Sequence, residues 1–280
     1  VVVIGGGTAG LEAACTAAEV GCNTFLLEKS NELGGLASLI SKIPAKNRLA
    51  DFPHYLMHRA EQLDNLYIFK NTEGTPENIR KFHPNIIVSS TGSAPLLPPI
   101  AGLKDRIDNE KHNIYSILGM ISHINDFPKD LEGKKVVVVG GGAVGLDVVE
   151  FFADRNADIS IVEMMDQIGR DLDPVSKNDT KTMMKKHNVH QLTKTALLEV
   201  KDSSFLVRGD GEPYELPFEY GFVCLGMRAQ GQLYQNLTEE FSSEDVEIMN
   251  IGDSQRARRI IDGTQEGRNI LTILEQKGYL

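Results

Sequence analysis

Two glycine-rich segments contain the residues whose types and spacing predict chemistry. The first runs from Gly5 to Gly10 and fits the pattern G-x-G-x-x-G. In this pattern the first glycine turns the chain out of a strand, the second lets the backbone approach a pyrophosphate, and the third lets a helix pack closely on the strand. The free N–H groups at the start of that helix favour negative charge. The segment therefore predicts a dinucleotide site at Gly5, Gly7, Thr8, Ala9 and Gly10.

An acidic residue follows this first segment at the place where a dinucleotide site needs one. Glu28 comes directly after the apolar run 24–27, and Lys29 follows it. A carboxylate at the end of this strand accepts hydrogen bonds from ribose hydroxyls. A glycine-rich turn with a surface glutamate is the alternative, but the complete order of strand, loop, helix, strand and acid disfavours it. We therefore include Glu28 and Lys29 in the predicted site.

The second glycine-rich segment repeats the pattern from Gly140 to Gly145, and Glu163 follows it at the spacing of Glu28. Glu163 would repel a ribose phosphate, which usually requires an arginine. Its neighbours Met164, Met165 and Asp166 offer no cation. The second site is therefore expected to prefer NADH over NADPH. Its predicted ligands are Gly142, Ala143, Val144, Gly145 and Glu163.

Each glycine segment must be held between two strands. Apolar runs at 1–4 and 24–27 enclose the first helix, and runs at 136–139 and 159–162 enclose the second. A strand–helix–strand unit with a short crossover implies a parallel sheet. Two such units far apart in the sequence predict an α/β protein with two doubly wound, Rossmann-like domains. Further on, the pattern predicts short strands over 195–225, a strand over 246–251 and one helix over 260–274.

The composition excludes several other classes of protein. Hydrophobic residues make up 41% and charged residues 24%, which is typical of globular proteins, and no apolar run is long enough to cross a bilayer. The net charge of −10 disfavours nucleic-acid binding. The three cysteines are far apart, so a reducing cytoplasm is the simplest setting. Because the chain starts without Met inside a predicted strand, it is either part of a longer polypeptide or a mature protein without its first residues.

Further motifs resemble those of flavoproteins with two dinucleotide-binding domains. Glu32-Leu33-Gly34-Gly35 is similar to their second FAD-contacting turn, and Ser90-Thr91-Gly92-Ser93-Ala94-Pro95 is similar to their hinge, with Ser90 where alanine is usual. Val223 to Arg228 resembles the strand end after the NAD domain, and Ile251-Gly252-Asp253 resembles the late motif whose aspartate binds the ribityl chain. The resemblance implies an FAD domain at 1–107 and 232–280, with an NAD(H) domain inserted at 108–231.

One subgroup is the most similar. Gly34 to Ala37 followed by Lys42-Ile43-Pro44, and Gly252-Asp253 followed by 258–263 and 266–267, resemble the C-terminal half of NADH:flavin oxidoreductases related to dienoyl-CoA reductase, enoate reductase and trimethylamine dehydrogenase. In that subgroup an N-terminal barrel carries FMN, an iron–sulfur cluster and the substrate site. The resemblance thus implies hydride transfer from NADH to FAD, with electrons leaving for a barrel that this chain lacks. Residues 229–230 depart from the subgroup pattern after Arg228.

The resemblance also implies roles for individual residues. Gly35 and Leu36 are expected near the ribityl side of FAD, and Thr91 and Gly92 near its adenine half. Gly252 and Asp253 are expected at the ribityl chain or the pyrophosphate, and the helix that begins near Ile260 is expected to point at the flavin ring. Gly226 is expected at NADH. No acid–base residue is assigned, because hydride passes directly between two cofactors.

The sequence also offers other candidate functions and sites. A disulfide reductase or NADH oxidase would need a redox cysteine, and residues 36–50 contain none. A structural domain that binds ADP at the first site, without redox activity, remains an alternative. His54 and His58 have helical spacing but no third ligand nearby, so no metal site is predicted. The cluster of Arg256, Arg258 and Arg259 either lines the flavin or is solvated. The oligomeric state is open, a homo-oligomer included.

Overall fold

The computed structural model describes residues 1–280 as two compact units. The first unit comprises 1–42, 46–94 and 228–280, and the second comprises 43–45 and 95–227. The sequence-based domain borders, 107/108 and 231/232, lie 13 and 4 residues beyond the unit limits at 94/95 and 227/228. Residues 95–107 lie in the second unit because the helix α5 (Leu103–Arg106) packs against its strand β10 (Ala196–Val200).

A five-stranded parallel sheet forms the centre of the first unit, in the order β15-β4-β1-β2-β3. The apolar runs of the sequence form its middle strands, and β1 and β4 are completely buried. The late strand β15 pairs with β4, so the end of the chain completes the sheet that its beginning starts. The strands are β1 (Val2–Ile4), β2 (Thr24–Leu27), β3 (Leu66–Phe69), β4 (Ile86–Ser89) and β15 (Glu247–Asn250).

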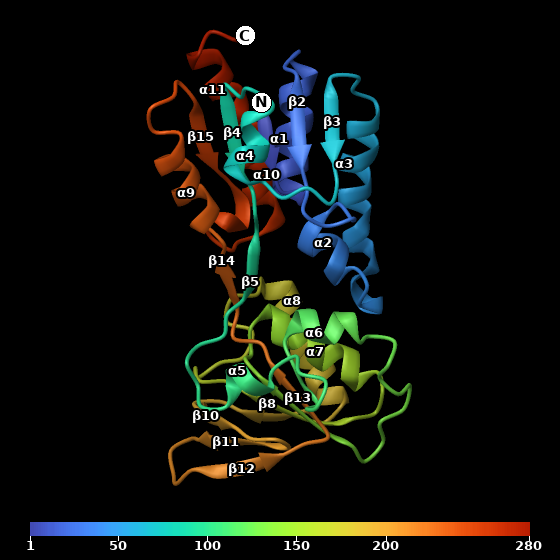
Figure 1. The fold of residues 1–280 in the computed structure, drawn as a ribbon. Helices are drawn as coiled ribbons and strands as arrows, with labels where there is room; N and C mark the ends of the chain where they lie inside the picture. The colour runs from blue at the N-terminus through green and yellow to red at the C-terminus, as the bar shows by residue number, and fades with distance from the viewer. The chain divides into compact units, whose positions relative to one another are not determined.

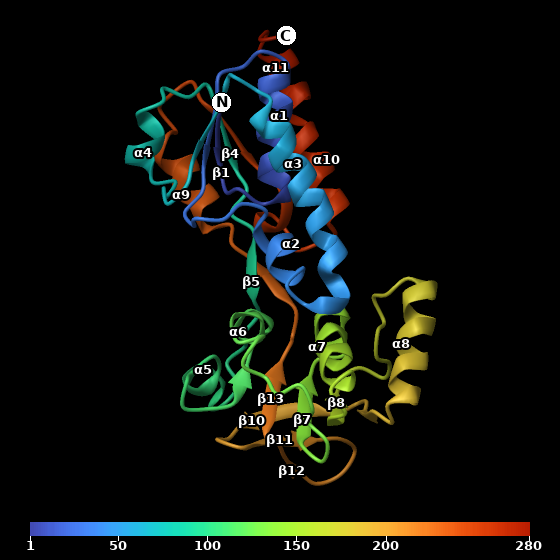
Figure 2. The same ribbon diagram turned by 90° about the vertical axis from the view of Figure 1, so that its right-hand side faces the viewer.

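Helices cover both faces of this sheet (Figure 2). One face carries α1 (Thr8–Glu19), α3 (Asp51–Glu61), α10 (Ile260–Arg268) and α11 (Ile270–Gln276), and the other carries α4 (Pro76–Arg80) and α9 (Gln232–Glu240). α1 is rich in alanine, which allows it to lie buried between the sheet and its neighbouring helices. A short α2 (Gly35–Ile40) and two 3-10 segments, Pro44–Ala50 and Gly252–Ser254, complete the helical elements of this part.

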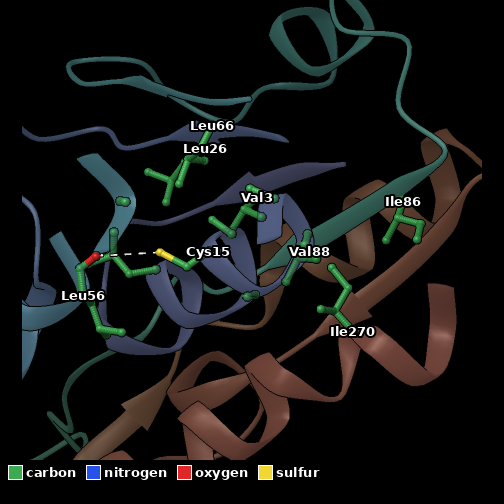
Figure 3. Close-up of a cluster of buried hydrophobic side chains, with 14 of the residues drawn as sticks. Val3, Cys15, Leu26, Leu56, Leu66, Ile86, Val88 and Ile270 are labelled. Atoms are coloured by element: carbon green, nitrogen blue, oxygen red, sulfur yellow. Dashed lines mark hydrogen bonds between the residues drawn. The ribbon is translucent and has the colours of Figure 1, made fainter. Parts of the chain in front are cut away.

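The core under α1 contains Cys15 (Figure 3). The residue is fully buried among Val3, Leu26, Leu56 and Val88, which belong to the same apolar cluster. Its thiol donates a weak hydrogen bond to the backbone oxygen of Leu56, at 3.7 Å. Cys15 is therefore a packing residue, the usual role of a buried free cysteine.

The second unit repeats the doubly wound pattern and adds an antiparallel sheet (Figure 1). Its parallel sheet has the order β6-β13-β7-β8-β9, and β10-β11-β12 form the antiparallel sheet. The remaining strands are β6 (Ile114–Tyr115), β7 (Lys135–Val139), β8 (Asp158–Val162), β9 (His190–Leu192), β11 (Ser204–Arg208), β12 (Tyr214–Pro217) and β13 (Tyr220–Val223). Its other helices are α6 (Ile117–Ser122), α7 (Ala143–Ala153) and α8 (Pro174–Lys186). The short strands β5 (Ser93–Pro95) and β14 (Met227–Ala229) pair with each other.

The α/β fold with two Rossmann-like parallel sheets confirms the predicted fold class. The single helix predicted over 260–274 is wrong, because α10 ends at Arg268 and α11 begins at Ile270, with Asn269 between them. The N–H of Asn269 is shared between the backbone oxygens of Gln265 and Glu266, a pattern typical of a helix end. Every helix of the chain is too short or too polar to cross a lipid bilayer.

Candidate functional site

The first glycine loop is tightly packed at Gly5 and Gly10 and has open space at Gly7. A Cβ on Gly5, whose φ is +100°, would lie 2.3 Å from the backbone oxygen of Ser90, and a Cβ on Gly10 would lie 2.0 Å from the oxygen of Gly5. The nearest atom to a Cβ on Gly7 would be the Cα of Gly35, at 4.0 Å. Gly5 and Gly10 are therefore required by internal packing, whereas the backbone at Gly7 is free to approach a ligand.

No protein group satisfies the start of the two helices that follow the glycine loops. α1 begins after Gly7 and α7 after Gly142, with no side-chain cap and no acidic residue in the first turn. In contrast, Thr75, Ser116 and Asp173 cap α4, α6 and α8 with their own oxygens. The first N–H groups of an uncapped helix need an acceptor, and a phosphate supplies one. These two helix starts fit the pyrophosphates of two dinucleotides.

Glu28 supports the first glycine loop through its carboxylate. One carboxylate oxygen accepts the N–H of Gly6 at 2.7 Å, and the other accepts the N–H of Ser30 at 2.8 Å. A carboxylate offers about four lone-pair sites, so two remain for ribose hydroxyls. Lys29 is exposed next to it.

The turn at Gly34 and Gly35 lies directly against the first loop. The N–H of Gly34 donates to the backbone oxygen of Gly6 at 2.7 Å, and a Cβ on Gly35 would lie 3.0 Å from the Cα of Gly7. Both glycines have positive φ, and Leu36 follows in the first turn of α2. The structure therefore brings Gly35 next to Gly7, and Leu36 follows Gly35 in the chain.

The late motif reaches the same loop from the other end of the chain. A Cβ on Gly252 would lie 2.8 Å from the Cβ of Ala9, so the motif packs against the start of α1. Asp253 accepts the hydroxyl of Ser93 at 2.9 Å and the N–H of Arg258 at 3.0 Å. Glu266 accepts the N–H of Gly252 at 2.7 Å. Ser93 and Glu266, which the sequence analysis did not assign, orient this motif.

Four further predicted residues lie near the β5–β14 pair and at the start of α10. The hydroxyl of Thr91 donates to the backbone oxygen of Gln230 at 2.7 Å. Gly92 and Gly226 have positive φ and open space at their Cβ positions. Ile260 begins α10 and is partly exposed. Of the arginine cluster, Arg258 pairs with Glu266 and Arg259 with Asp262, so these two guanidinium groups have partners in the adjoining helix α10.

The second glycine loop has the same geometry as the first. Gly141 and Glu163 are 22 residues apart, like Gly6 and Glu28, and the N–H of Gly141 donates to Glu163 at 2.6 Å. A Cβ on Gly140 would lie 2.1 Å from the oxygen of Cys224, and one on Gly145 would lie 1.9 Å from the oxygen of Gly140. The chain therefore contains two dinucleotide cradles of the same construction, each made of a G-x-G-x-x-G loop, the glutamate that binds this loop and the start of the helix that follows it.

A pocket of about 340 Å³ opens at this second loop. The pocket is lined by Gly141, Gly142, Glu163, Met165, Gln167, Arg170 and Asp171. Of these, Gly142 and Glu163 were predicted as ligands from the sequence, and the others were not. Arg170 also lines this pocket, so the site contains a cation that the immediate sequence neighbours of Glu163 do not provide. The turn before Arg170 brings it there, since the N–H of Gly169 donates to the oxygen of Gly141 at 2.7 Å. The sequence contained a signal for this turn, because Gly169 follows Gly140 at the same distance along the chain as Gly34 follows Gly5.

The thiols are not arranged for redox chemistry. Cys15 and Cys224 are buried, Cys22 is partly exposed, and none forms a disulfide. Burial raises the pKa of the Cys15 thiol to about 11 and that of Cys224 to about 12, and burial also raises the pKa of Cys22. A reactive thiol needs a lowered pKa. No cluster of side chains suited to a metal is present, and the ring of His58 lies near Glu61 and Gln62.

Comparison with known proteins places this geometry in context. A family model described as pyridine nucleotide-disulphide oxidoreductase matches residues 1–249. The chain is 28% identical to an NADH oxidase of Thermoanaerobacter brockii over 95% of its length and 40% of the relative's. It is also 28% identical to a bilirubin reductase of Mediterraneibacter gnavus, over 95% of its length and 39% of that enzyme. The chain thus spans about two fifths of these relatives.

Solved structures share the fold. The complex of a 2-naphthoyl-CoA reductase superposes with a TM-score of 0.81 at 24% identity, covering 96% of this chain and 39% of that one. A thioredoxin reductase of T. acidophilum superposes with a TM-score of 0.71 at 16% identity, covering 100% of this chain and 98% of that one. The first neighbour is much longer than this chain, whereas the second has nearly the same extent.

Proposed function

The chain belongs to the pyridine nucleotide-disulphide oxidoreductase family, whose members bind FAD and NAD(H), and on that premise we propose that it accepts electrons from NADH through FAD. FAD is assigned to the first unit and NADH to the second. The observation that carries the proposal is the duplicated cradle, in which each uncapped helix start follows a G-x-G-x-x-G loop that is held by its own glutamate.

Each group of residues has a positioning role in this proposal. Bound FAD supplies the hydride-accepting chemistry. The N–H groups after Gly7 and Gly142 hold the pyrophosphates, and Glu28 and Glu163 hold the adenosine riboses. Gly35, Leu36 and Asp253 are assigned to the flavin half, which is supported by the contact of Gly35 with Gly7 and by the packing of Gly252, the neighbour of Asp253, on Ala9. No side chain of the chain is assigned to proton transfer.

We propose that the electrons leave for a part of the polypeptide outside this chain. The curated relatives are more than twice as long as the segment they share with it. The resemblance to NADH:flavin oxidoreductases suggests that this part is an N-terminal barrel with FMN and an iron–sulfur cluster, where an unsaturated substrate is reduced. The absence of a reactive thiol in the chain supports an acceptor of this kind over a disulfide.

An absorbance spectrum of the purified chain with added FAD, taken before and after NADH under anaerobic conditions, tests the proposal. We expect a flavin band that bleaches with NADH, because both cradles are complete within the chain. Protein that retains no FAD but binds ADP would instead support a structural ADP-binding domain. Bound FAD that NADH cannot bleach would contradict the assignment of the second site.

Removal of the cysteines distinguishes this reading from a disulfide reductase. The variant with Cys15→Ala, Cys22→Ala and Cys224→Ala should bleach with NADH at a rate within about twofold of the wild type, because hydride transfer between cofactors needs no thiol. In the wild type at pH 8, a thiol reagent should label Cys22 before the other two, since the buried thiols have raised pKa values. A triple variant that folds and binds FAD but no longer bleaches would show that a thiol takes part.

A further inference from the structure

The carboxylate of Glu266 closes the loop between β15 and α10. Its Oε2 atom accepts the N–H of Gly252 at 2.7 Å, and its Oε1 atom accepts the guanidinium of Arg258. Gly252 is buried and begins the 3-10 segment Gly252–Ser254, so its N–H has no partner within that turn. A buried N–H without an acceptor is costly. Glu266, whose side chain is only 22% exposed, therefore fixes both ends of the loop.

Asp253 lies between these two ends of the loop. One of its carboxylate oxygens accepts the backbone N–H of Arg258 at 3.0 Å, and the other accepts the hydroxyl of Ser93 at 2.9 Å. A carboxylate offers about four lone-pair sites, so two remain for the hydroxyls of a ligand. These two sites are available to the flavin half of FAD only while no cation of the protein occupies them.

The guanidinium of Arg258 is a cation that could occupy them. The pKa of this guanidinium is raised, first by its hydrogen bond to Glu266 and further by the charges of Glu266, Asp262 and Asp253. Asp262 already pairs with Arg259 at 3.5 Å. Once Glu266 is removed, Asp253 is therefore the neighbouring carboxylate that has no cationic partner of its own.

The remaining acceptors of this guanidinium are neutral. It donates to the backbone oxygen of Arg256 at 3.2 Å and to the side-chain oxygen of Gln255 at 3.4 Å. An ion pair between a guanidinium and a carboxylate is stronger than a hydrogen bond to a neutral oxygen, because both partners are charged. Without Glu266, the Arg258 side chain would therefore turn toward Asp253.

We propose that Glu266 is a positioning residue of the flavin site, which keeps the guanidinium of Arg258 away from the carboxylate of Asp253. The inference rests on the proposed function, because it assumes that Asp253 accepts hydroxyls of FAD. Glu266 acts in two ways, by accepting the N–H of Gly252 and by binding the cation. The second way distinguishes it from a purely structural residue, because removal of the cation should then compensate for removal of Glu266.

Titration of the apoprotein with FAD, followed by the change in flavin fluorescence, tests this inference. Glu266→Ala should raise the dissociation constant by about tenfold or more, because it leaves an N–H unsatisfied and frees the cation. Glu266→Gln should lose less, since its amide oxygen still accepts one of the two donors. Addition of Arg258→Ala to Glu266→Ala should tighten FAD binding again by about threefold or more. Glu275→Ala, which removes an exposed carboxylate from α11, is the matched control and should bind FAD like the wild type.

The effect of Arg258→Ala in the Glu266→Ala background decides the inference. A further loss of FAD affinity, or no recovery, would overturn it and leave the proposed function in place. Urea unfolding of the apoproteins identifies a variant that loses FAD because it does not fold, and in that case Glu266→Gln with and without Arg258→Ala gives the same comparison. A wild type that binds ADP but not FAD would contradict the proposed function, and the inference with it.

Discussion

Gly10→Ala is expected to abolish retention of FAD while NADH binding persists. The added Cβ would lie 2.0 Å from the backbone oxygen of Gly5 and 2.4 Å from the hydroxyl oxygen of Ser90. The Ser90 side chain can rotate away, but the Gly5 oxygen is fixed between β1 and α1. The start of α1 must therefore move, which costs about 1–3 kcal/mol of folding stability as overpacking. The same movement displaces the N–H groups that the pyrophosphate requires.

The reciprocal substitution in the second unit tests whether the two cradles act independently. In Gly145→Ala the Cβ would lie 1.9 Å from the oxygen of Gly140, so NADH binding should fail while the flavin band remains. Gly211→Ala is the control, because nothing lies within 4 Å of its Cβ position. FAD content by absorbance and NADH binding by calorimetry give the two readouts. Retention of FAD by a folded Gly10→Ala protein would contradict the assignment of FAD to the first loop.

The sequence predicted the residues that are fixed by backbone geometry. The sequence pattern identified four such residues, Gly5, Gly10, Gly140 and Gly145. Each is required because the close packing of strand, turn and helix leaves no room for a Cβ. Glu28 and Glu163 could be located from their place at strand ends. Their hydrogen bonds to Gly6 and Gly141 could not, because they depend on how the carboxylate rotates toward the loop.

Residues that reach the site through irregular segments were harder to predict. Arg170 enters the second pocket through the turn at Gly169, and no helical or strand period marks that turn. Ser93 meets Asp253 although the two are 160 residues apart in the sequence. The break between α10 and α11 at Asn269 could not be predicted from the hydrophobic pattern either, because apolar residues continue on one face into α11. Tertiary contacts, and not local periodicity, decide these positions.

Glu12→Ala is expected to cause the largest loss of stability in the first unit. The carboxylate of Glu12, whose side chain is only 5% exposed, accepts Nη1 of Arg59 at 2.9 Å and Nε of Arg268 at 2.8 Å. These contacts join α1 to α3 and α10. In the variant Arg59, with a side chain 11% exposed, keeps Glu19 as its ion-pair partner and a hydrogen bond to the hydroxyl of Thr16. Breaking a buried pair from one side costs about 3–5 kcal/mol, and we expect the lower value because Arg268 is exposed to solvent.

Urea unfolding measures the loss of stability, and the amount of bound FAD measures the consequence for cofactor binding. Glu77→Ala is the control, because Glu77 is exposed and its carboxylate lies 4.0 Å from Lys81. That variant should stay within about 0.5 kcal/mol of the wild type. Since Glu12 ties α10 to α1 where Gly252 packs on Ala9, the Glu12→Ala protein should also bind FAD more weakly. An unchanged urea midpoint would show that the ion pairs only offset the desolvation of their charges, in which case α1 is held by apolar packing alone.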